Sequence, residues 1–176
     1  MELTIAYWNT AGRNGLASLI LDSDQEYDIV AIQEPWYNKQ TQSIYGPARG
    51  RYYRLYDSGR AALYIHKRHQ QNTWTTEAGP DWCKVRFGTG QDAITVWSIY
   101  SPIPEGSRWT SPLHVLAGQE PEGHQVLVGD FNLHHPLWDR EGRTTRESET
   151  LLSLAQKWDL KLATPWGEPI RIRHKH

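Results

Sequence analysis

The sequence predicts a single α/β domain in which a strand, a helix and a strand precede antiparallel hairpins. Apolar runs rich in β-branched and aromatic residues occur at 3–9 and 28–36, with a short helical stripe between them. Two further pairs of strand-like segments, within 51–65 and 82–100, flank turns that contain glycine. The 176 residues are enough for one domain with a hydrophobic core and too few for two independent ones. We therefore treat 1–176 as one domain.

The N-terminal unit consists of two expected strands around one expected helix. Segment 3–9 is apolar and ends in an amide, which favours a strand with a polar end. Asn14 is expected to cap the helix, and Leu19 belongs to its apolar stripe. The near-continuous apolar run of 28–36 is typical of a strand covered on both faces, and it ends in Glu34.

The middle and the end of the chain supply two hairpins, two helices and further strands. A helical apolar face within 151–158 follows a capping-box spacing between Thr144 and Glu147. The other expected elements are hairpin strands at 51–56, 60–65, 82–87 and 93–100, a short helix near 113–116, a strand through 126–128 that stops at Gly129, and a short strand at 160–163.

Charge and cysteine content exclude several classes of protein. Lys plus Arg (19) nearly balances Asp plus Glu (20), so nucleic-acid binding would depend on local clusters rather than on net charge. Cys83 is the only cysteine, which excludes an intramolecular disulfide and a zinc site built from cysteines. No window reaches the roughly 18 apolar residues of a membrane span. We expect a soluble intracellular protein, in the nucleus or the cytoplasm.

Polar side chains recur where the apolar strands end. In open α/β sheets, ligands collect beyond the strand ends, so these side chains are expected to converge. Two carboxylates and two amides without cysteine suit a hard divalent cation such as Mg²⁺ or Mn²⁺. The reaction that a site of this kind performs is phosphodiester cleavage. The candidate site residues are Asn9, Glu34, Tyr100, Asp130 and Asn132.

The segment after Gly129 carries the densest group of polar residues. Alternation along an extended chain places Asp130 and Asn132 on one side and Phe131 on the other, toward the interior. His134 and His135 are adjacent and tend to face opposite ways, so we favour packing or contact with the substrate edge over metal binding.

Four motifs, in this order and at these separations, resemble the endonuclease/exonuclease/phosphatase superfamily. The likeness covers nearly the whole chain and is closest to the apurinic-type endonuclease domain of LINE-type (non-LTR) retrotransposons, because Gln33-Glu34-Pro35-Trp36 and the run 132–139 are similar to that branch. The four motifs are Trp8-Asn9, Gln33-Glu34-Pro35-Trp36, Tyr100-Ser101-Pro102 and Gly129-Asp130-Phe131-Asn132.

The resemblance implies a DNase I-like sandwich of two packed mixed β-sheets flanked by helices, and metal-dependent hydrolysis of a phosphodiester in DNA. Glu34 would be the principal metal ligand, with Asn9 beside it orienting the metal or the phosphate. Asp130 would orient or help deprotonate the attacking water. Asn132 would hold the scissile phosphate, and Tyr100 would donate a hydrogen bond to the developing negative charge.

The sequence departs from this family toward its C-terminus. Family members have a closing Ser-Asp-His segment that completes the catalytic site, and nothing after Asp139 resembles it. His174 and His176 are weak replacements, because a chain terminus rarely holds the geometry that base catalysis needs. We therefore expect a domain that lacks its C-terminal part, with an incomplete second half and an unpaired sheet edge open to self-association.

Two alternatives to an endonuclease remain open at this point. A catalytically inactive fragment could act as a nucleic-acid or protein interaction module, and the same fold could hydrolyse a phosphoinositide or sphingolipid head group.

For contact with a DNA backbone, Arg140, Arg143 and Arg146 are favoured over other basic groups because they follow the site loop. His66 and His69 are expected to form a solvated strand end.

Overall fold

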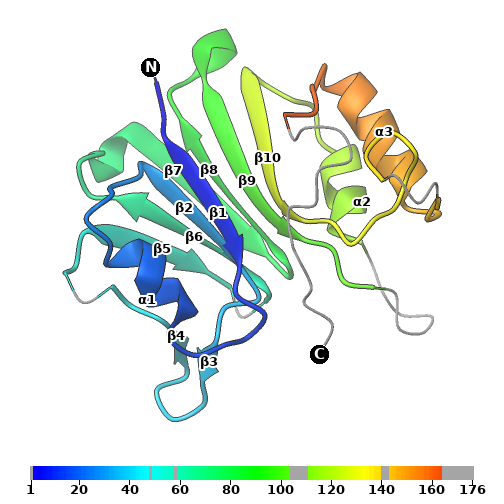
Figure 1. Ribbon diagram of the computed structural model, residues 1–176. Helices are drawn as coiled ribbons and strands as arrows, with labels where there is room; N and C mark the ends of the chain where they lie inside the picture. Colours follow the sequence, from blue (N-terminus) through cyan, green and yellow to red (C-terminus); the bar gives the residue numbers. More distant parts are fainter. Residues whose placement is uncertain (1, 48, 58, 104–110, 140–142, 164–176) are drawn as a thin grey trace, which may run out of the picture.

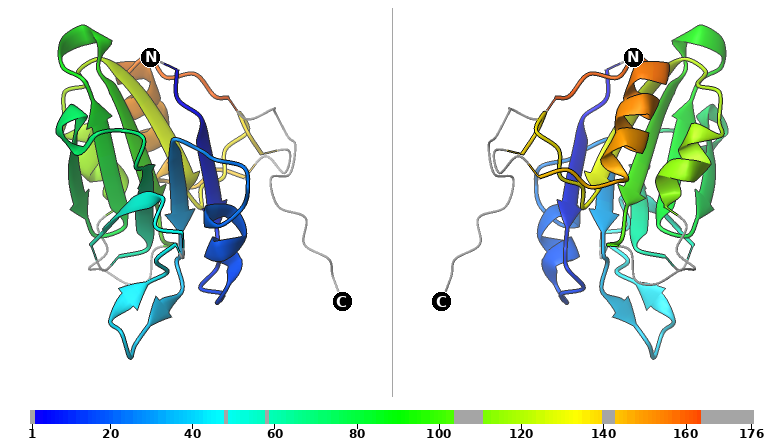
Figure 2. Two further views of the ribbon diagram at one scale, coloured as in Figure 1. Left: turned by 90° about the vertical axis from the view of Figure 1, so that its left-hand side faces the viewer. Right: turned by 90° about the vertical axis from the view of Figure 1, so that its right-hand side faces the viewer.

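Two β-sheets pack face to face in the computed structural model, and helices cover their outer faces (Figure 1). The structure describes residues 2–47, 49–57, 59–103, 111–139 and 143–163. Strand order is β1-β2-β6-β5 in the first sheet and β10-β9-β8-β7 in the second. The side views look onto the two outer faces of the sandwich, with α1 in front in one view and α2 and α3 in front in the other, and the β3–β4 hairpin extends beyond the strand ends (Figure 2). This arrangement confirms the expected sandwich of two mixed sheets.

The strands of the two sheets and the small hairpin are β1 (Ile5–Asn9), β2 (Ile29–Gln33), β3 (Tyr37–Asn38), β4 (Ser43–Ile44), β5 (Tyr52–Tyr56), β6 (Ala61–His66), β7 (Trp74–Gly79), β8 (Trp82–Phe87), β9 (Ile94–Tyr100) and β10 (His124–Asp130). The helices are α1 (Leu16–Leu21), α2 (Pro112–Ala117) and α3 (Ser148–Lys157), with short 3-10 turns at Gln71–Thr73 and Gly90–Asp92.

The N-terminal unit forms as expected, with β1 parallel to β2 and α1 between them. Every residue of β2 is buried, as its continuous apolar run predicts. The expected details of α1 were wrong. Gly15, in a left-handed conformation, occupies the N-cap position in place of Asn14. Leu19 is 63% exposed, and Ala17 and Leu21 face the sheet instead.

The second sheet contains the expected β8–β9 hairpin and a further edge strand, β7, that the sequence analysis did not anticipate. β7 escaped notice because its middle residues Thr75, Thr76 and Glu77 are polar and exposed, without an apolar alternation. β10 pairs in parallel with β9. Two parallel pairs, one at an edge of each sheet, therefore bring the ends of β1, β2, β9 and β10 to one end of the sandwich (Figure 1).

Two expectations for the C-terminal part were wrong. Glu147 is the N-cap of α3 and makes no side-chain cap, so the capping box with Thr144 does not form. Ser148 provides the local bond instead, because its hydroxyl donates to the carbonyl of Thr145. Segment 160–163 has no strand structure. In the described part of the chain, no helix has the length and apolar character needed to cross a bilayer.

Alternating side chains divide the interior into three apolar layers. From β2, Ile29 and Ala31 point between the sheets, whereas Val30 and Ile32 pack against α1. A third layer lies between the second sheet and helices α2 and α3, and Trp97 lies at its centre in contact with two other tryptophans. The sheets are therefore fixed to each other and to the helices, which holds the strand ends in place.

Candidate active site

Asn9 connects two carboxylates from the two sheets. Its Nδ2 donates to Oε1 of Glu34 at 2.8 Å and to Oδ2 of Asp130 at 2.7 Å. All three side chains are half-buried. The Asn9 amide thus joins three of the five predicted site residues at one end of the sandwich, although Asn9 and Asp130 are 121 positions apart in sequence.

The orientation of the Asn9 amide is fixed by its second polar atom. Oδ1 accepts from the backbone N–H of Ala11 at 2.7 Å, so the nitrogen faces the carboxylates. The amide therefore aligns Glu34 and Asp130 and partly balances their charge. Ligation of a metal by the Asn9 oxygen stays a prediction, and it requires the amide to turn around.

Backbone strain gathers at this end of the sheets. Six non-glycine residues of the described chain have positive φ, and among them Glu34 has 47° and Asn132 has 49°. Such conformations cost about 1–3 kcal/mol each and persist where the surroundings impose them, often at functional sites. Backbone hydrogen bonds impose the one at Glu34, whose N–H donates to the carbonyl of Arg60 and whose carbonyl accepts from Gly12.

Asn132 is held at the site by Ser101, the residue after β9, and by Asp130. Its Nδ2 donates to the carbonyl of Ser101 at 2.9 Å, and its backbone N–H donates to Oδ1 of Asp130 at 3.1 Å. Phe131 packs into the helix-side layer, as expected. The extended alternation assumed for this segment was wrong at Asn132, because its left-handed backbone ends the strand geometry.

Gly129 allows Asp130 to reach this position. A Cβ at Gly129 would lie 1.9 Å from the carbonyl oxygen of Ile99, the residue opposite it on β9. Only glycine permits that approach of the two strands. The glycine that marked the strand end in the sequence is thus a packing requirement immediately before the site carboxylate.

Tyr100 lies at the end of β9, only 9% exposed, with its ring under the guanidinium of Arg60 at 4.7 Å. Burial raises the pKa of Tyr100, and the charge of Glu34 raises it further. The phenol therefore remains protonated in neutral solution and can donate a hydrogen bond. Nothing in the sequence distinguished Arg60, which precedes a strand as many surface arginines do.

A polar pair lies directly below the site, between the sheets. Gln33 is fully buried, and its Nε2 donates to Oγ of Ser98 on β9 at 3.0 Å. Its Oε1 has no partner among the described residues. This bond joins β2, which precedes Glu34, to β9, which ends in Tyr100. It fixes how far one strand is displaced along the other.

The donor set fits a hard divalent cation. Mg²⁺ is commonly bound by one or two carboxylates, with water and substrate oxygens completing its shell. Glu34 and Asp130 offer two carboxylates, and among the described residues no group of three or more His, Cys, Asp or Glu is close enough to enclose an ion. A site of this kind would depend on the substrate phosphate for part of the coordination.

Other residues named from the sequence lie around the site or outside the described chain. Arg143 and Arg146 are exposed between the site loop and α3, whereas Arg140 lies outside the described residues, as do 174 and 176. Nδ1 of His134 is hydrogen-bonded to Asp139, and the ring of His135 packs on Trp138 at 5.1 Å. The contact of His135 agrees with packing, whereas His134 makes a polar contact and its side chain is 49% exposed.

The opposite end of β2 carries a third carboxylate that the sequence analysis did not single out. Asp28 accepts from the backbone and the hydroxyl of Thr4, from Arg68 at 2.7 Å and from His69 at 2.6 Å. The expectation of a solvated strand end at His66 and His69 was wrong, because their side chains are only 11% and 17% exposed.

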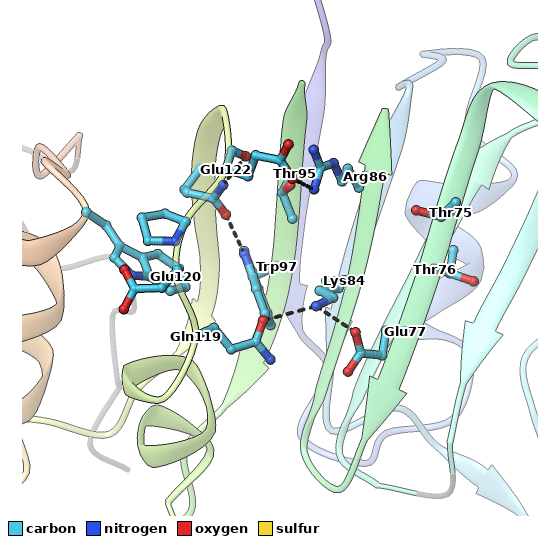
Figure 3. Close-up of a pocket in the computed structure, with 13 residues that line it drawn as sticks. Thr75, Thr76, Glu77, Lys84, Arg86, Thr95, Trp97, Gln119, Glu120 and Glu122 are labelled. Atoms are coloured by element: carbon cyan, nitrogen blue, oxygen red, sulfur yellow. Dashed lines mark hydrogen bonds and ion pairs between the residues drawn. The ribbon is translucent and has the colours of Figure 1, made fainter. Parts of the chain in front are cut away.

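A cavity of about 290 Å³ lies on the outer face of the second sheet, away from the end of the sandwich that carries Asn9, Glu34 and Asp130 (Figure 3). Its charged groups already have partners, and for Glu120 the partner is Lys157 from α3. Lys84 lies between Glu77 at 2.6 Å and Gln119 at 3.1 Å, and Arg86 pairs with Glu122 at 2.6 Å. This cavity offers a ligand little that is not already satisfied, so the candidate site remains the strand ends.

Comparisons with known proteins agree with this geometry. The sequence profile described as the Endonuclease/Exonuclease/phosphatase family matches residues 6–174. A solved structure described as the endonuclease domain of TRAS1, a telomere-specific non-LTR retrotransposon, is similar with a TM-score of 0.55 and 13% identity, over 89% of this chain and 72% of that one. No curated protein matches the chain. At this identity the structural likeness shows the fold, which is the expected DNase I-like sandwich.

Proposed function

Because the chain belongs to the endonuclease/exonuclease/phosphatase family, we propose that it is a divalent-metal-dependent phosphodiesterase of endonuclease type that nicks DNA, as a retrotransposon-derived domain. The observation that carries this proposal is the pair of carboxylates held by one amide, Glu34 and Asp130 on Asn9. No cation of the described chain forms an ion pair with either carboxylate, so the two charges favour a bound metal ion.

The proposed reaction gives each of the five residues at the strand ends one role. Glu34 would hold the ion, Mg²⁺ or Mn²⁺, and Asn9 would orient that carboxylate. A bound ion supplies charge neutralisation at the phosphoryl oxygen and a more acidic water. Asp130 accepts the proton of the attacking water. Asn132 holds the scissile phosphate, and the protonated phenol of Tyr100 donates to the developing negative charge.

DNA is the proposed substrate because the matching solved structure is named as an endonuclease domain. Arg143 and Arg146, both exposed beside the site loop, would contact backbone phosphates together with Arg140. A lipid head group as substrate remains an outcome of the test below.

Nicking of a supercoiled plasmid tests the proposal. The purified chain should convert supercoiled to open-circular DNA in Mg²⁺ or Mn²⁺, EDTA should stop the conversion, and Glu34→Gln should abolish it. The matched control is Glu77→Gln, because Glu77 is an exposed acid on β7 far from the site. Absence of nicking in either metal at any protein concentration would contradict the proposal. Release of phosphate from phosphoinositides without nicking would replace DNA by a lipid substrate.

A second candidate function, an interaction module, is favoured by the open edges of the sheets. Within the described residues no strand pairs with the outer edge of β1 or of β10. On β1, Tyr7 is 43% and Trp8 36% exposed. Unpaired edges with apolar side chains invite a further strand, including one from a second copy. Light scattering at increasing concentration tests this self-association: a dimer that Tyr7→Lys returns to monomer supports it, and a wild-type monomer throughout contradicts it.

A further inference from the structure

Arg60 is a cation at the edge of the site whose position is fixed by three hydrogen bonds. Its Nε and Nη2 both donate to the carboxylate of Asp81 at 2.9 Å, and its backbone N–H donates to the same group at 2.9 Å. Its guanidinium also stacks on the ring of Tyr100, 4.7 Å from the centroid. An exposed arginine is ordinarily flexible, and this one is held in a single orientation.

The turn that presents Arg60 is built around Asp81. A Cβ at Gly59 would lie 2.5 Å from the backbone nitrogen of Asp81, so the two turns touch where no other residue would fit. Asp81 itself has a φ of 64°, a strained value for a residue with a side chain. Its carbonyl accepts from the backbone N–H of Tyr100 at 2.8 Å. One strained residue thus positions both Arg60 and Tyr100.

The geometry of the ion pair leaves the cation facing solvent. The side chain of Arg60 is 46% exposed, whereas that of Asp81 is 17% exposed. Because Nε and one N–H of Nη2 are directed at Asp81, the N–H groups of Nη1 and the second N–H of Nη2 remain for a ligand. The backbone carbonyl of Arg60 also accepts from Glu34, which keeps this cation next to the site carboxylates.

We propose that Arg60 binds a non-bridging phosphate oxygen of the nucleic-acid strand that occupies the site. This inference rests on the proposed function and adds a substrate contact to it. A phosphodiester must approach two carboxylates, Glu34 and Asp130, that repel its charge. A guanidinium fixed beside them offsets that repulsion, and its planar donors match the geometry of phosphate oxygens. Asp81 is a positioning residue, because it orients Arg60 and does not touch the substrate.

Salt dependence of DNA binding distinguishes a phosphate contact from a structural role. The affinity of the whole chain for a fluorescent 20-base-pair duplex is measured by anisotropy in EDTA, over a range of KCl concentrations. Each lost phosphate contact reduces the slope of log K against log salt by about 0.9. Arg60→Gln should reduce the slope by this amount and weaken binding about tenfold. Arg60→Lys keeps the charge and should restore the slope.

Two further variants complete the experiment. Arg49→Gln is the matched control, because Arg49 forms an exposed ion pair with Asp24 away from the site, and it should leave slope and affinity unchanged. Asp81→Asn keeps the charge of Arg60 and releases its guanidinium, so affinity should fall while the slope stays at the wild-type value. If Arg60→Gln does not fold, as judged by the absence of a cooperative unfolding transition, Asp81→Asn still tests the role of Arg60.

The outcomes separate this inference from the proposed function. An equal slope in wild type and Arg60→Gln, or equal affinity in wild type and Asp81→Asn, overturns the role of Arg60 even if the wild type nicks plasmid. A reduced slope in Arg60→Gln supports the role even if no nicking is found, in which case only the catalytic proposal fails. A wild type that does not bind the duplex overturns both.

Discussion

The two ends of strand β2 hold carboxylates in opposite circumstances. Asp28, at the beginning of the strand, is 6% exposed and is surrounded by donors from Thr4, Arg68 and His69. Glu34, directly after the strand, is half-buried and shares one amide with Asp130. A few residues along one strand therefore separate an acid that the protein satisfies by itself from acids that it leaves short of positive charge.

This difference shows how a carboxylate becomes structural or functional. Burial by itself would raise the pKa of Asp28, but hydrogen bonds led by the one from Arg68 hold that pKa well below its usual range. Asp28 therefore has no need of a further cation. At the other end the neutral amide of Asn9 donates hydrogen bonds to Glu34 and Asp130 but carries no positive charge, so a cation can still bind there. The following predictions test whether the two ends are as different as their contacts indicate.

The largest effect is expected at the site end. Asp130→Asn should lower the nicking rate about 10²- to 10⁴-fold, the range for loss of a general base. Its free energy of unfolding should stay equal to that of the wild type or increase, since one of two neighbouring negative charges is removed. Single-turnover nicking and urea unfolding measure the two quantities. A large loss of stability with normal nicking would make Asp130 a structural acid like Asp28.

The reverse result is expected for Asp28→Asn. An asparagine at this position would accept fewer of the hydrogen bonds that Thr4, Arg68 and His69 donate to the buried carboxylate, so the free energy of unfolding should fall by about 1–3 kcal/mol. Nicking per folded molecule should not change, because the site lies at the other end of the sheet. Urea unfolding followed by tryptophan fluorescence provides the measurement. A stable variant with lost nicking would contradict the division between the two ends.

Gly129→Ala should have an intermediate effect that combines stability and activity. The added Cβ would meet the carbonyl oxygen of Ile99 at 1.9 Å, so β10 must move away from β9 at the residue before Asp130. Overpacking of this kind costs about 1–3 kcal/mol. The control is Gly46→Ala, whose Cβ meets only Nη1 of Arg54 at 3.8 Å. Equal stability of the two variants would show that the close strand approach is not needed.

The smallest effect is the acid dependence of stability that Asp28 contributes. Its pKa is depressed in the folded chain, so its contribution is complete well above the ordinary value of 3.8 and is lost as the pH falls below it. Between pH 5 and pH 3 the wild type should lose about 1 kcal/mol more than Asp28→Asn. Burial lowers the pKa of His66 and the charge of Asp28 opposes that shift, so a change in His66 titration adds to the difference between the two proteins. Parallel curves would contradict the assignment.

The sequence predicted those elements whose side chains carry a one-dimensional pattern. The buried run of β2 and the polar residues at the ends of β1, β2, β9 and β10 were visible as composition along the chain. The edge strand β7 was not visible, because an exposed polar strand has the composition of a loop. The N-caps of α1 and α3 were predicted wrongly because Gly15 and Glu147 occupy the N-cap positions without a side-chain hydrogen bond, so no capping side chain marks these helix starts in the sequence.

The sequence predicted which residues form the candidate site but not which atoms of those residues contact one another. Asn9, Glu34 and Asp130 were named from strand ends and motif, and the parallel pairing then brings them together. The direction of the Asn9 amide depends on Ala11 N–H, which no side-chain pattern records. Arg60 and Asp28 depend on partners from distant turns and strands, so their roles appear only in three dimensions.

Metal binding by the site end tests the central claim most directly. Titration of Mn²⁺ followed by its free-ion paramagnetic resonance signal compares wild type, Glu34→Gln and Asp28→Asn without any need for turnover. Wild type and Asp28→Asn should bind Mn²⁺ equally, and Glu34→Gln should bind at least about tenfold more weakly, since even indirect partners of a ligand cost about 10- to 100-fold. Equal binding by all three proteins would contradict the claim that Glu34 holds the ion.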